Sequence, residues 1–380
     1  MRILIVGGGI GGLTLAIALH RRGQDVMVAE AAPGLAAAGA GIALWPNALR
    51  ALRSLQLDEP VIAAGERLER GALRDADGTL LVESDHRFLE RETGAPIVAL
   101  HRADLQSILL SALPGHLVQL NKRLTGFDQN TPTVKARFTD GSSADSDVLI
   151  GADGIHSVVR ASLRPEITPR YAGYVAWRGV VEDVDVDAAD TAMTTESWGP
   201  GARFGMVPIG RRRVYWFATA NGPAGVRRAP EERRAELLRR FGQWHAPIRQ
   251  LIEQTPVEHL LENDIEDLAP FRGWSRGRVG LMGDAAHATT PNLGQGACMA
   301  IESAVALAAQ LTMGQSIAAA LENYENERRA RTAWVTRQSW RMGQVGQWER
   351  PWLCALRRQL MRRAPASTAE NMLRRAVGAR

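Results

Sequence analysis

A glycine-rich turn between two apolar runs most constrains what this chain can fold into. Residues 2–6 (RILIV) form a short apolar run, as a buried parallel strand does. The turn 7–12 (GGGIGG) follows directly, and 13–23 (LTLAIALHRRG) then has helical spacing and closes with basic residues and a glycine. Residues 25–30 (DVMVAE) read as a second strand that ends in an acid. This order predicts a compact strand–turn–helix–strand unit.

The turn satisfies G-x-G-x-x-G through Gly7, Gly9 and Gly12, and Gly11 adds a fourth small residue. Such a turn needs a tight bend, a bare backbone beside a pyrophosphate and close helix–strand packing, and its phosphates meet unpaired N–H groups at the helix start. Glu30 stands 18 residues after Gly12, where a carboxylate binds ribose hydroxyls. The pattern predicts a dinucleotide site, against the alternative of a merely glycine-rich turn. The acid disfavours a phosphorylated ribose because like charges would face each other.

Two further turns carry an acid and glycines between a strand and a helix. The first is Gly151-Ala152-Asp153-Gly154, and the second begins Gly283-Asp284 and continues to Ala304. Each could be only an Asp-capped helix start. Their order and spacing after the first turn favour a shared nucleotide site.

The remaining patterns predict an interleaved α/β chain. Helical spacing occurs at 44–57, 102–113, 230–254, 295–312 and 316–345, hairpin patterns at 72–83 and 136–154, an antiparallel sheet at 170–220 and a buried strand within 278–287. We expect a Rossmann-like nucleotide-binding domain formed by 1–70, 100–165 and 271–345, with an interleaved β-rich substrate domain formed by 71–99 and 166–270. Residues 346–380 are expected to form a basic C-terminal helical tail.

Charge and cysteine content exclude several classes of protein. The formal net charge is +5, but residues 350–380 hold eight arginines and one acid, so the tail carries +7 and the rest −2. Nucleic-acid binding is therefore not expected. Two cysteines exclude a disulfide framework and a cysteine-built zinc site, no metal site is expected, and this usage suits a reducing cytoplasm. No secretory signal or membrane span is expected.

With these motifs in place, the sequence resembles the class A flavoprotein monooxygenases, the FAD-dependent aromatic hydroxylases, over most of the chain outside the tail. The resemblance implies that the first turn binds the ADP half of FAD. It also implies that Asp284 contacts the ribityl chain, Asp153 the pyrophosphate region and the nicotinamide donor, and Arg102 the FAD phosphates and ribityl. A helix beginning after Gly294-Gln295-Gly296 would aim its backbone N–H groups at the negative charge of reduced flavin. Gly294, Gly296 and Ala297 are therefore expected to bind the cofactor.

The same resemblance implies the reaction. NADH or NADPH would visit transiently to reduce FAD, since there is no second glycine fingerprint. O2 would then add at flavin C4a, and the hydroperoxide would deliver oxygen to an electron-rich substrate. An oxygen-independent flavin reductase is the remote alternative on this scaffold.

Within the family, residues 45–47 (WPN), 171–181 (YAGYVAWRGVV) and 289–298 (TTPNLGQGAC) resemble the bacterial FAD-dependent urate hydroxylases. Arg203 and Tyr215 match the arginine and tyrosine that those enzymes carry on neighbouring strands. A guanidinium stabilises a urate anion, and Tyr215 would orient either the arginine or the ring. Asn292 departs from an aspartate that urate hydroxylases can carry, so a phenolic acid or another heteroaromatic substrate stays open.

Other residues favour structural roles. His287 is expected to be a structural turn residue rather than a general base, and Cys298 to be buried rather than nucleophilic. Trp177 and Trp216 are candidates to border the substrate. Beyond Trp352 the tail helix places Leu353, Leu356 and Leu360 opposite arginines, which favours domain packing or a homodimer contact over membrane attachment.

Overall fold

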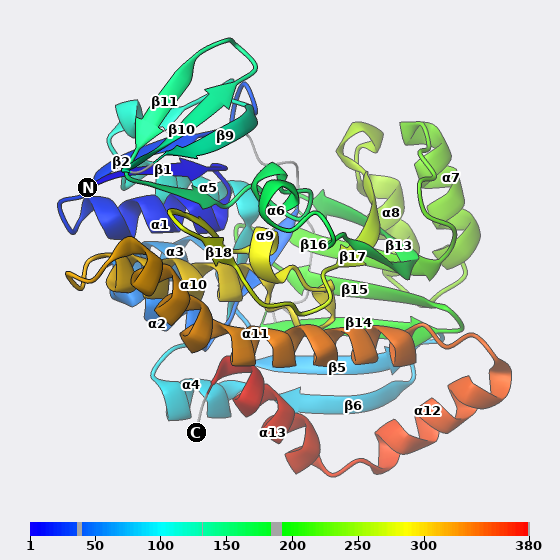
Figure 1. Cartoon of the computed structure of the whole chain (residues 1–380). Helices are drawn as coiled ribbons and strands as arrows, with labels where there is room; N and C mark the ends of the chain where they lie inside the picture. The colour runs from blue at the N-terminus through cyan, green and yellow to red at the C-terminus, as the bar shows by residue number, and fades with distance from the viewer. Residues whose placement is uncertain (36–39, 131, 184–191, 379–380) are drawn as a thin grey trace.

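The computed structural model describes residues 1–35, 40–130, 132–183 and 192–378, and these residues form four β-sheets with helices packed around them (Figure 1). The parallel sheet and a small three-stranded sheet occupy one end of the molecule, and the largest sheet occupies the other (Figure 1). Helix α10 (Gly296–Leu311) lies in the part with the parallel sheet, and helix α11 (Ile317–Gly346) runs from there along the largest sheet (Figure 1).

The six-stranded sheet sets the positions of the three glycine-containing turns. Its order is β18-β19-β12-β1-β2-β8, and all of its pairings are parallel except β18 with β19. Val6 of β1 pairs with Gly151 of β12, and Gly151 pairs with Leu281 of β19. The three strands therefore end level, and the turns after them lie at one edge. The strands are β1 (Arg2–Val6), β2 (Asp25–Ala29), β8 (Val118–Gln119), β12 (Val148–Gly151), β18 (Ser275–Arg276) and β19 (Val279–Leu281).

Apolar helices pack on this sheet and form the largest core cluster. Helix α1 (Ile10–His20) packs against α10 (Gly296–Leu311), and α10 also contacts α2 (Pro46–Arg53) and α11 (Ile317–Gly346). Ile5, Leu15 and Ile301 are fully buried in this cluster. The shorter helices of this part are α3 (Asp58–Ala64), α5 (Arg102–Ser111), α6 (Val158–Leu163) and α9 (Asp284–His287).

Two small antiparallel sheets flank these layers. One has the order β3-β7-β4 and the other β11-β10-β9. Their strands are β3 (Gly41–Leu44), β4 (Glu66–Arg67), β7 (Val98–His101), β9 (Leu124–Asn130), β10 (Thr133–Phe138) and β11 (Ser143–Ser146).

The seven-stranded sheet has two faces of different chemistry. Its order is β17-β13-β16-β15-β14-β5-β6, antiparallel except for β14 with β5. Because side chains alternate along a strand, Trp177, Phe204 and Trp216 point to one face, where they pack with α7 and α8. Arg203 and Tyr215 point to the other face. The elements are β5 (Arg70–Asp75), β6 (Leu80–Asp85), β13 (Arg170–Val181), β14 (Met193–Gly199), β15 (Ala202–Pro208), β16 (Val214–Asn221), β17 (Leu261–Asp267), α7 (Pro230–Phe241) and α8 (Ile248–Gln254).

Most predicted elements are confirmed, with one correction at 230–254. The predicted single helix is wrong: it is two helices, because the chain leaves α7 at Gly242 and Pro247 precedes α8. Proline has no N–H to continue a helical ladder, so the second helix starts afresh after it. Strands β5 and β6, from the predicted piece 71–99, pair into the same sheet as strands from 166–270. The domain boundaries themselves stay a prediction.

The C-terminal region leaves the body and returns to it. After α11, helix α12 (Pro351–Arg363) projects at one corner, and α13 (Ala366–Val377) comes back beside α4 (Arg87–Thr93) (Figure 1). Three short 3-10 turns complete the described elements, at Gly115–Leu117, Val257–His259 and Pro291–Leu293. Among the helices within the described ranges, none has the length and apolarity needed to cross a membrane.

A buried carboxylate fastens the long helix α11 to the parallel sheet. Glu325 accepts hydrogen bonds from the backbone N–H groups of Gly273 (2.8 Å) and Trp274 (2.7 Å), just before β18. Trp274 is itself buried in the main core. The long helix is therefore tied to the sheet edge by two charge-assisted bonds.

We expect Glu325→Ala to lower the free energy of unfolding by about 2–3 kcal/mol, because it leaves two buried N–H groups without acceptors. The measurement is urea unfolding of the FAD-loaded chain. The matched control is Glu322→Ala on the exposed side of the same helix, which should change stability by less than about 0.5 kcal/mol. Equal effects of the two substitutions would contradict the assignment.

Candidate active site

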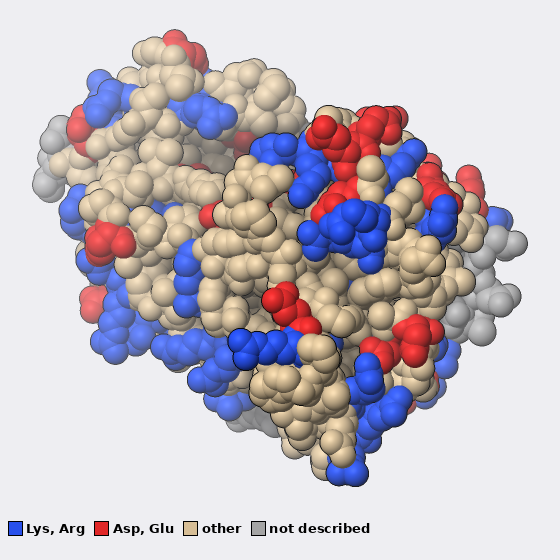
Figure 2. All heavy atoms as spheres, turned by 90° about the vertical axis from the view of Figure 1, so that its right-hand side faces the viewer, with Lys and Arg blue, Asp and Glu red and all other residues tan. Residues whose placement is uncertain are grey.

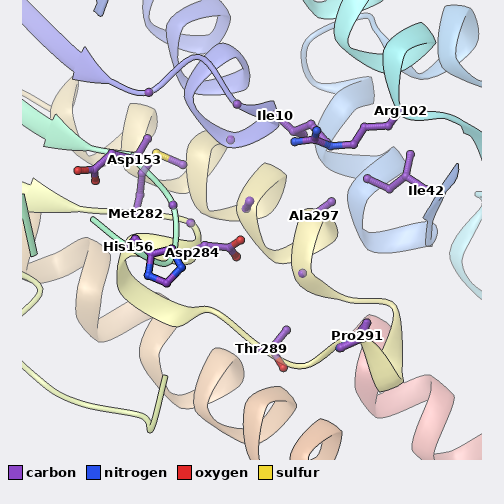
Figure 3. Close-up of a pocket in the computed structure, with 18 of the residues that line it drawn as sticks. Ile10, Ile42, Arg102, Asp153, His156, Met282, Asp284, Thr289, Pro291 and Ala297 are labelled. Atoms are coloured by element: carbon purple, nitrogen blue, oxygen red, sulfur yellow. The ribbon is translucent and has the colours of Figure 1, made fainter. Parts of the chain in front are cut away.

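One cavity of about 780 Å³ lies between the edge of the parallel sheet and the large sheet. Its volume falls in the usual range for pockets that take small molecules and cofactors. Figure 3 shows the side chains that line part of it, with Asp284 and Thr289 on opposite sides of one turn and Arg102 beside Ile10. The predicted cofactor residues at this cavity are Gly7, Gly9, Gly11, Glu30, Arg102, Asp153, Asp284, Gly294, Gly296 and Ala297, and the predicted catalytic residues Arg203 and Tyr215 line it too.

The glycines of the first turn have different tasks. Gly7 has φ +108°, and a Cβ there would lie 2.4 Å from the Ala152 carbonyl oxygen. A Cβ at Gly12 would lie 2.0 Å from the Gly7 oxygen, so Gly12 serves packing and does not line the cavity. At Gly9 a Cβ would meet no protein atom within 4 Å. Gly9 therefore keeps cavity space free, which is what close approach of a pyrophosphate requires.

The start of α1 supplies donors to that space. Gly9 is the N-cap residue of α1 and makes no side-chain capping bond. The first N–H groups of a helix have no partner within it, and the positive end of the helix dipole favours phosphate. Since Ile10 and Gly11 line the cavity, this helix start fits the pyrophosphate of a dinucleotide.

Glu30 lies at the end of β2 and also serves the backbone. Its Oε2 accepts the N–H of Gly8 (2.7 Å) and its Oε1 accepts the N–H of Ala32 (2.7 Å). These bonds hold the carboxylate at the cavity in one orientation. A carboxylate has about four lone-pair positions, so Glu30 can still accept from ribose hydroxyls as the sequence predicts.

Asp153 and Asp284 look alike in sequence but differ in the structure. The Asp153 carboxylate accepts from the N–H groups of Val158 (2.8 Å) and Val159 (3.2 Å), so it caps the start of α6. Its pKa is raised by burial, while these bonds oppose the shift. Asp153 therefore satisfies two N–H groups at the start of α6 from the rim of the cavity, while the N-cap residue of that helix is Ser157.

Asp284 projects into the cavity from the first residue of α9 (Figure 3). Its side chain is accessible from the cavity but is surrounded by protein, which raises its pKa, and Arg102 opposes that shift. Arg102 begins α5 and lines the same cavity. A carboxylate and a guanidinium that both face the open space fit the hydroxyl-rich chain and the phosphates that the resemblance assigns to them.

The loop before α10 closes the next side of the cavity. Gly294 adopts φ +61°, and α10 starts at Gly296 with no side-chain cap on its first turn. Gly296 and Ala297 line the cavity, so small residues and free N–H groups face it together. Asn47 of α2 donates to the Gln295 side chain (3.1 Å) and fixes this helix start. The expected helix beginning after Gly294-Gln295 is confirmed.

Arg203 is the buried cation of the site, with 3% of its side chain exposed. Its Nη1 donates to Glu196 Oε1 (3.3 Å), its Nη2 to Asn292 Oδ1 (2.7 Å) and its Nε to Gln347 Oε1 (3.1 Å). The rings of Tyr174 and Trp198 lie within 6 Å of the guanidinium. A cation held from so many directions is rigid, which suits recognition of a ligand oxygen.

Tyr215 does not contact Arg203. The strand register pairs Arg203 with Thr219 and Val207 with Tyr215, so the two side chains share a face but are separated by about 13 Å along the strands. Phe217 stands between them on the same face. The expectation that Tyr215 orients the arginine is therefore wrong for this chain, and its possible role toward the substrate ring stays a prediction.

Of the three residues that hold Arg203, only Asn292 stands in a motif that the sequence analysis considered. Asn292, which departs from the urate hydroxylase pattern, donates to Tyr174 Oη (3.0 Å) and to the Ser339 carbonyl (2.8 Å) while accepting from Arg203. Burial raises the pKa of Tyr174. Glu196 lies two residues before Trp198 on a strand with no distinct motif, and Gln347 is 144 residues from Arg203 in the chain. No local signal points to these two.

Several other sequence expectations are settled by burial. Burial lowers the pKa of His287 to about 3, and its Nε2 pairs with Ser303 (3.0 Å) away from the cavity, as expected of a structural residue. Cys298 is fully buried, which raises its thiol pKa to about 12. Trp177 and Trp216 do not border the substrate: both lie in the core on the opposite face. No cluster of metal-ligating side chains occurs within the described part of the chain.

Gly9→Val and Gly12→Val should separate cofactor binding from folding. Valine at Gly9, where φ is −72°, is sterically allowed but occupies the phosphate space, so FAD affinity should fall by about tenfold or more while the apoprotein keeps its melting temperature. Valine at Gly12 collides with backbone and should destabilise the apoprotein itself. Flavin absorbance after dialysis and thermal unfolding measure the two effects. Unchanged flavin content in Gly9→Val would contradict the placement of the phosphates.

Known proteins resemble this chain over nearly its whole length. The aurachin C monooxygenase/isomerase of Stigmatella aurantiaca is 43% identical over 375 residues, 99% of this chain and 97% of that protein. The FAD-dependent urate hydroxylase of Klebsiella pneumoniae subsp. pneumoniae is 39% identical over 334 residues, 86% of each. The 2-heptyl-3-hydroxy-4(1H)-quinolone synthase of Pseudomonas aeruginosa is 36% identical over 385 residues, 99% of this chain and 97% of that protein.

A solved structure and a family model agree with these relatives. The structure of Klebsiella pneumoniae HpxO with FAD and uric acid superposes with a TM-score of 0.92 at 34% identity, covering 100% of this chain and 97% of that one. The family described as FAD binding domain matches residues 1–339. Three turns, a helix start without a side-chain cap and a buried arginine surround one cavity. In agreement with these features, the chain belongs to the FAD-binding-domain family and, within it, to the class A flavin-dependent monooxygenases.

Proposed function

We propose that this chain is an NAD(P)H- and O2-dependent FAD monooxygenase that hydroxylates an aromatic nitrogen heterocycle. The observation that carries the proposal is the shared cavity: the turns that fit FAD and the buried Arg203 line the same space. A binding protein for FAD alone would not need a fixed cation on the sheet opposite the cofactor turns.

The residues present fit FAD. Gly9 leaves space for the pyrophosphate, Glu30 faces the ribose end, and Asp284 and Arg102 face the ribityl and phosphate region. When bound, FAD supplies the redox chemistry, taking a hydride from the nicotinamide donor and activating O2. The start of α10 at Gly296 and Ala297 supplies N–H groups that favour negative charge on the reduced ring.

The rest of the cavity positions the substrate and limits water. Ile42, Val207, Phe217 and Pro291 give it apolar sides, which favour an aromatic ring and exclude water from the reacting atoms. Arg203 donates hydrogen bonds to an oxygen of the substrate and stabilises negative charge that develops there. The network through Asn292 and Gln347 holds the guanidinium in place while this happens.

Urate is the first candidate substrate, converted to 5-hydroxyisourate. Arg203 supports it, because urate reacts as an anion and a buried guanidinium binds an anionic oxygen strongly. The similarity to urate hydroxylases and to the uric acid complex gives further support.

The Glu196 carboxylate favours a second candidate, a neutral heterocycle that offers both a carbonyl and an N–H. Glu196 lines the cavity 3.3 Å from the Arg203 guanidinium, so the pair carries no net charge. An anion placed beside it would be repelled by the carboxylate, whereas a carbonyl can accept from Arg203 and an N–H can donate to Glu196. A 2-alkyl-4(1H)-quinolone has both groups, and a relative named for such a compound matches along 99% of this chain.

Substrate-dependent oxygen consumption tests the proposal. The yellow, FAD-loaded protein is given NADH or NADPH with urate, 2-heptyl-4(1H)-quinolone, salicylate or 4-hydroxybenzoate. We expect a heterocycle to stimulate nicotinamide oxidation with matching O2 uptake and one hydroxylated product. If only a phenolic acid stimulated nicotinamide oxidation with matching O2 uptake, the substrate would be a phenolic acid and not a heterocycle. Nicotinamide oxidation without O2 uptake would indicate a flavin reductase.

Substitutions at Arg203 and at its partner Glu196 identify the substrate's charge. Arg203→Gln should leave FAD bound but reduce kcat/KM by about 10²–10³, as loss of one preorganised donor does. Glu196→Gln should lower the KM for an anionic substrate by removing a like charge, and should raise the KM for a neutral N–H substrate by about tenfold. Normal turnover by Arg203→Gln would remove the basis of both candidates.

A further inference from the structure

Helix α12 buries an arginine against the body of the molecule and leaves two of its leucines exposed. The residues that face the body are Leu353 and Met361, which are half-buried, and Cys354 and Arg357, which are buried. The sequence led to the opposite expectation, because leucines face arginines around this helix and the leucines would normally be buried. The structure buries an arginine instead.

Arg357 is held by backbone carbonyls. Its Nη1 donates to Val345 O (3.1 Å) and Gly346 O (2.8 Å) at the end of α11, and its Nη2 donates to Gly199 O (3.0 Å) at the end of β14. The last carbonyls of a helix lack partners and carry partial negative charge, so a guanidinium is favourable there. Arg358 adds an ion pair to Asp75 (2.7 Å). This anchoring fixes the rotation of α12 about its axis.

That rotation turns an apolar stripe to the solvent. Trp352, Leu356 and Leu360 stand four residues apart and are 61%, 41% and 59% exposed. Side chains at this spacing lie on one side of a helix. Leu80 of β6, the strand that contacts α12, is exposed as well. Figure 2 shows the face that carries α12, where an uncharged ridge at the lower edge is bordered by blue side chains.

The charged residues of the helix itself have one sign, and Asp75 of β5 pairs with one of them, Arg358. The helix sequence PWLCALRRQLMRR contains no acid, and Arg350, Arg358, Arg362 and Arg363 are exposed along it. Tryptophan and leucine on one side, with arginine beside them, is the composition of helices that lie in the interface of a bilayer. Each arginine near an anionic leaflet adds to the attraction.

We propose that α12 docks this protein on the surface of an anionic lipid bilayer, with Trp352, Leu356 and Leu360 inserted among the headgroups and the arginines on lipid phosphates. A second copy of the chain fits less well, because two such helices face to face would oppose arginine with arginine and offer no acid. The helix packs on the body through Cys354 and Arg357, and the homodimer contact expected from the sequence stays a prediction that the experiment below tests. The helix attaches and does not span.

The docking helix lies beside the substrate cavity. Arg357 bonds to Gly346, and the next residue, Gln347, accepts from Arg203. A bilayer under α12 would therefore be near the end of the cavity that holds Arg203. This position suits a substrate that partitions into lipid, although docking does not depend on which substrate is used.

Vesicle co-sedimentation of the FAD-loaded full chain tests the docking. Vesicles of phosphatidylcholine with phosphatidylglycerol should bind it, and phosphatidylcholine alone should bind it much more weakly. The triple variant Trp352→Ser, Leu356→Ser, Leu360→Ser should lose about tenfold or more of the partition coefficient. Arg362→Gln with Arg363→Gln should lose about tenfold on anionic vesicles. Raising the salt to 1 M should weaken binding.

Met313→Ser is the matched control, because Met313 is 67% exposed and lies away from α12. It should bind vesicles like the parent protein, and all variants should keep their flavin and melting temperature because the changed side chains are exposed. Absence of binding to anionic vesicles, or binding that the triple variant retains, overturns the proposal. So does light scattering that shows a dimer abolished by the triple variant together with no vesicle binding, which would assign the stripe to a second copy.

Discussion

The level ends of three parallel strands are the constraint on which the cofactor site depends. Because β1, β12 and β19 are neighbours in register, the turns after Val6, Gly151 and Leu281 meet at one edge. Ligands of open α/β sheets bind at this edge, outside the carboxyl ends of the strands. The approach is close enough that a Cβ at Gly7 would collide with Ala152. The glycines are thus required by the meeting of segments that are far apart in the chain.

The large sheet completes the cavity with a single buried cation. Burying a guanidinium is unfavourable unless its N–H groups are bonded and its charge is balanced. Glu196 balances the charge of Arg203, and Asn292 and Gln347 take further N–H groups. The partners come from β14, the loop before α10 and the end of α11. Arg203 is therefore held in place only when the large sheet is packed against the loop before α10 and the end of α11. The Arg203–Glu196 pair itself carries no net charge, which bears on the kind of ring it admits.

Polar anchoring also explains why an apolar surface is left outside. Arg357 donates to the Val345 and Gly346 carbonyls at the end of α11, and a helix can present only one side to the body. Satisfying these groups turns Trp352, Leu356 and Leu360 outward. The surface proposed to meet lipid is in this sense a consequence of how the end of α11 is capped.

The sequence by itself determined the first βαβ unit, the three turns and most helices, because these depend on local periodicity and on glycine where no side chain fits. The resemblance to urate hydroxylases also implied that Arg203 and Tyr215 lie on neighbouring strands, as they do on β15 and β16. Only the tertiary structure decided that Asp153 bonds the start of a helix while Asp284 projects into the cavity, since similar turns differ in what packs beside them. It alone decided that Phe217 separates Tyr215 from Arg203, that Gln347 reaches Arg203 across 144 residues, and that Leu356 and Leu360 of α12 face outward. These features depend on which backbone and side-chain acceptors the fold brings near each donor, and no pattern along the chain records that proximity.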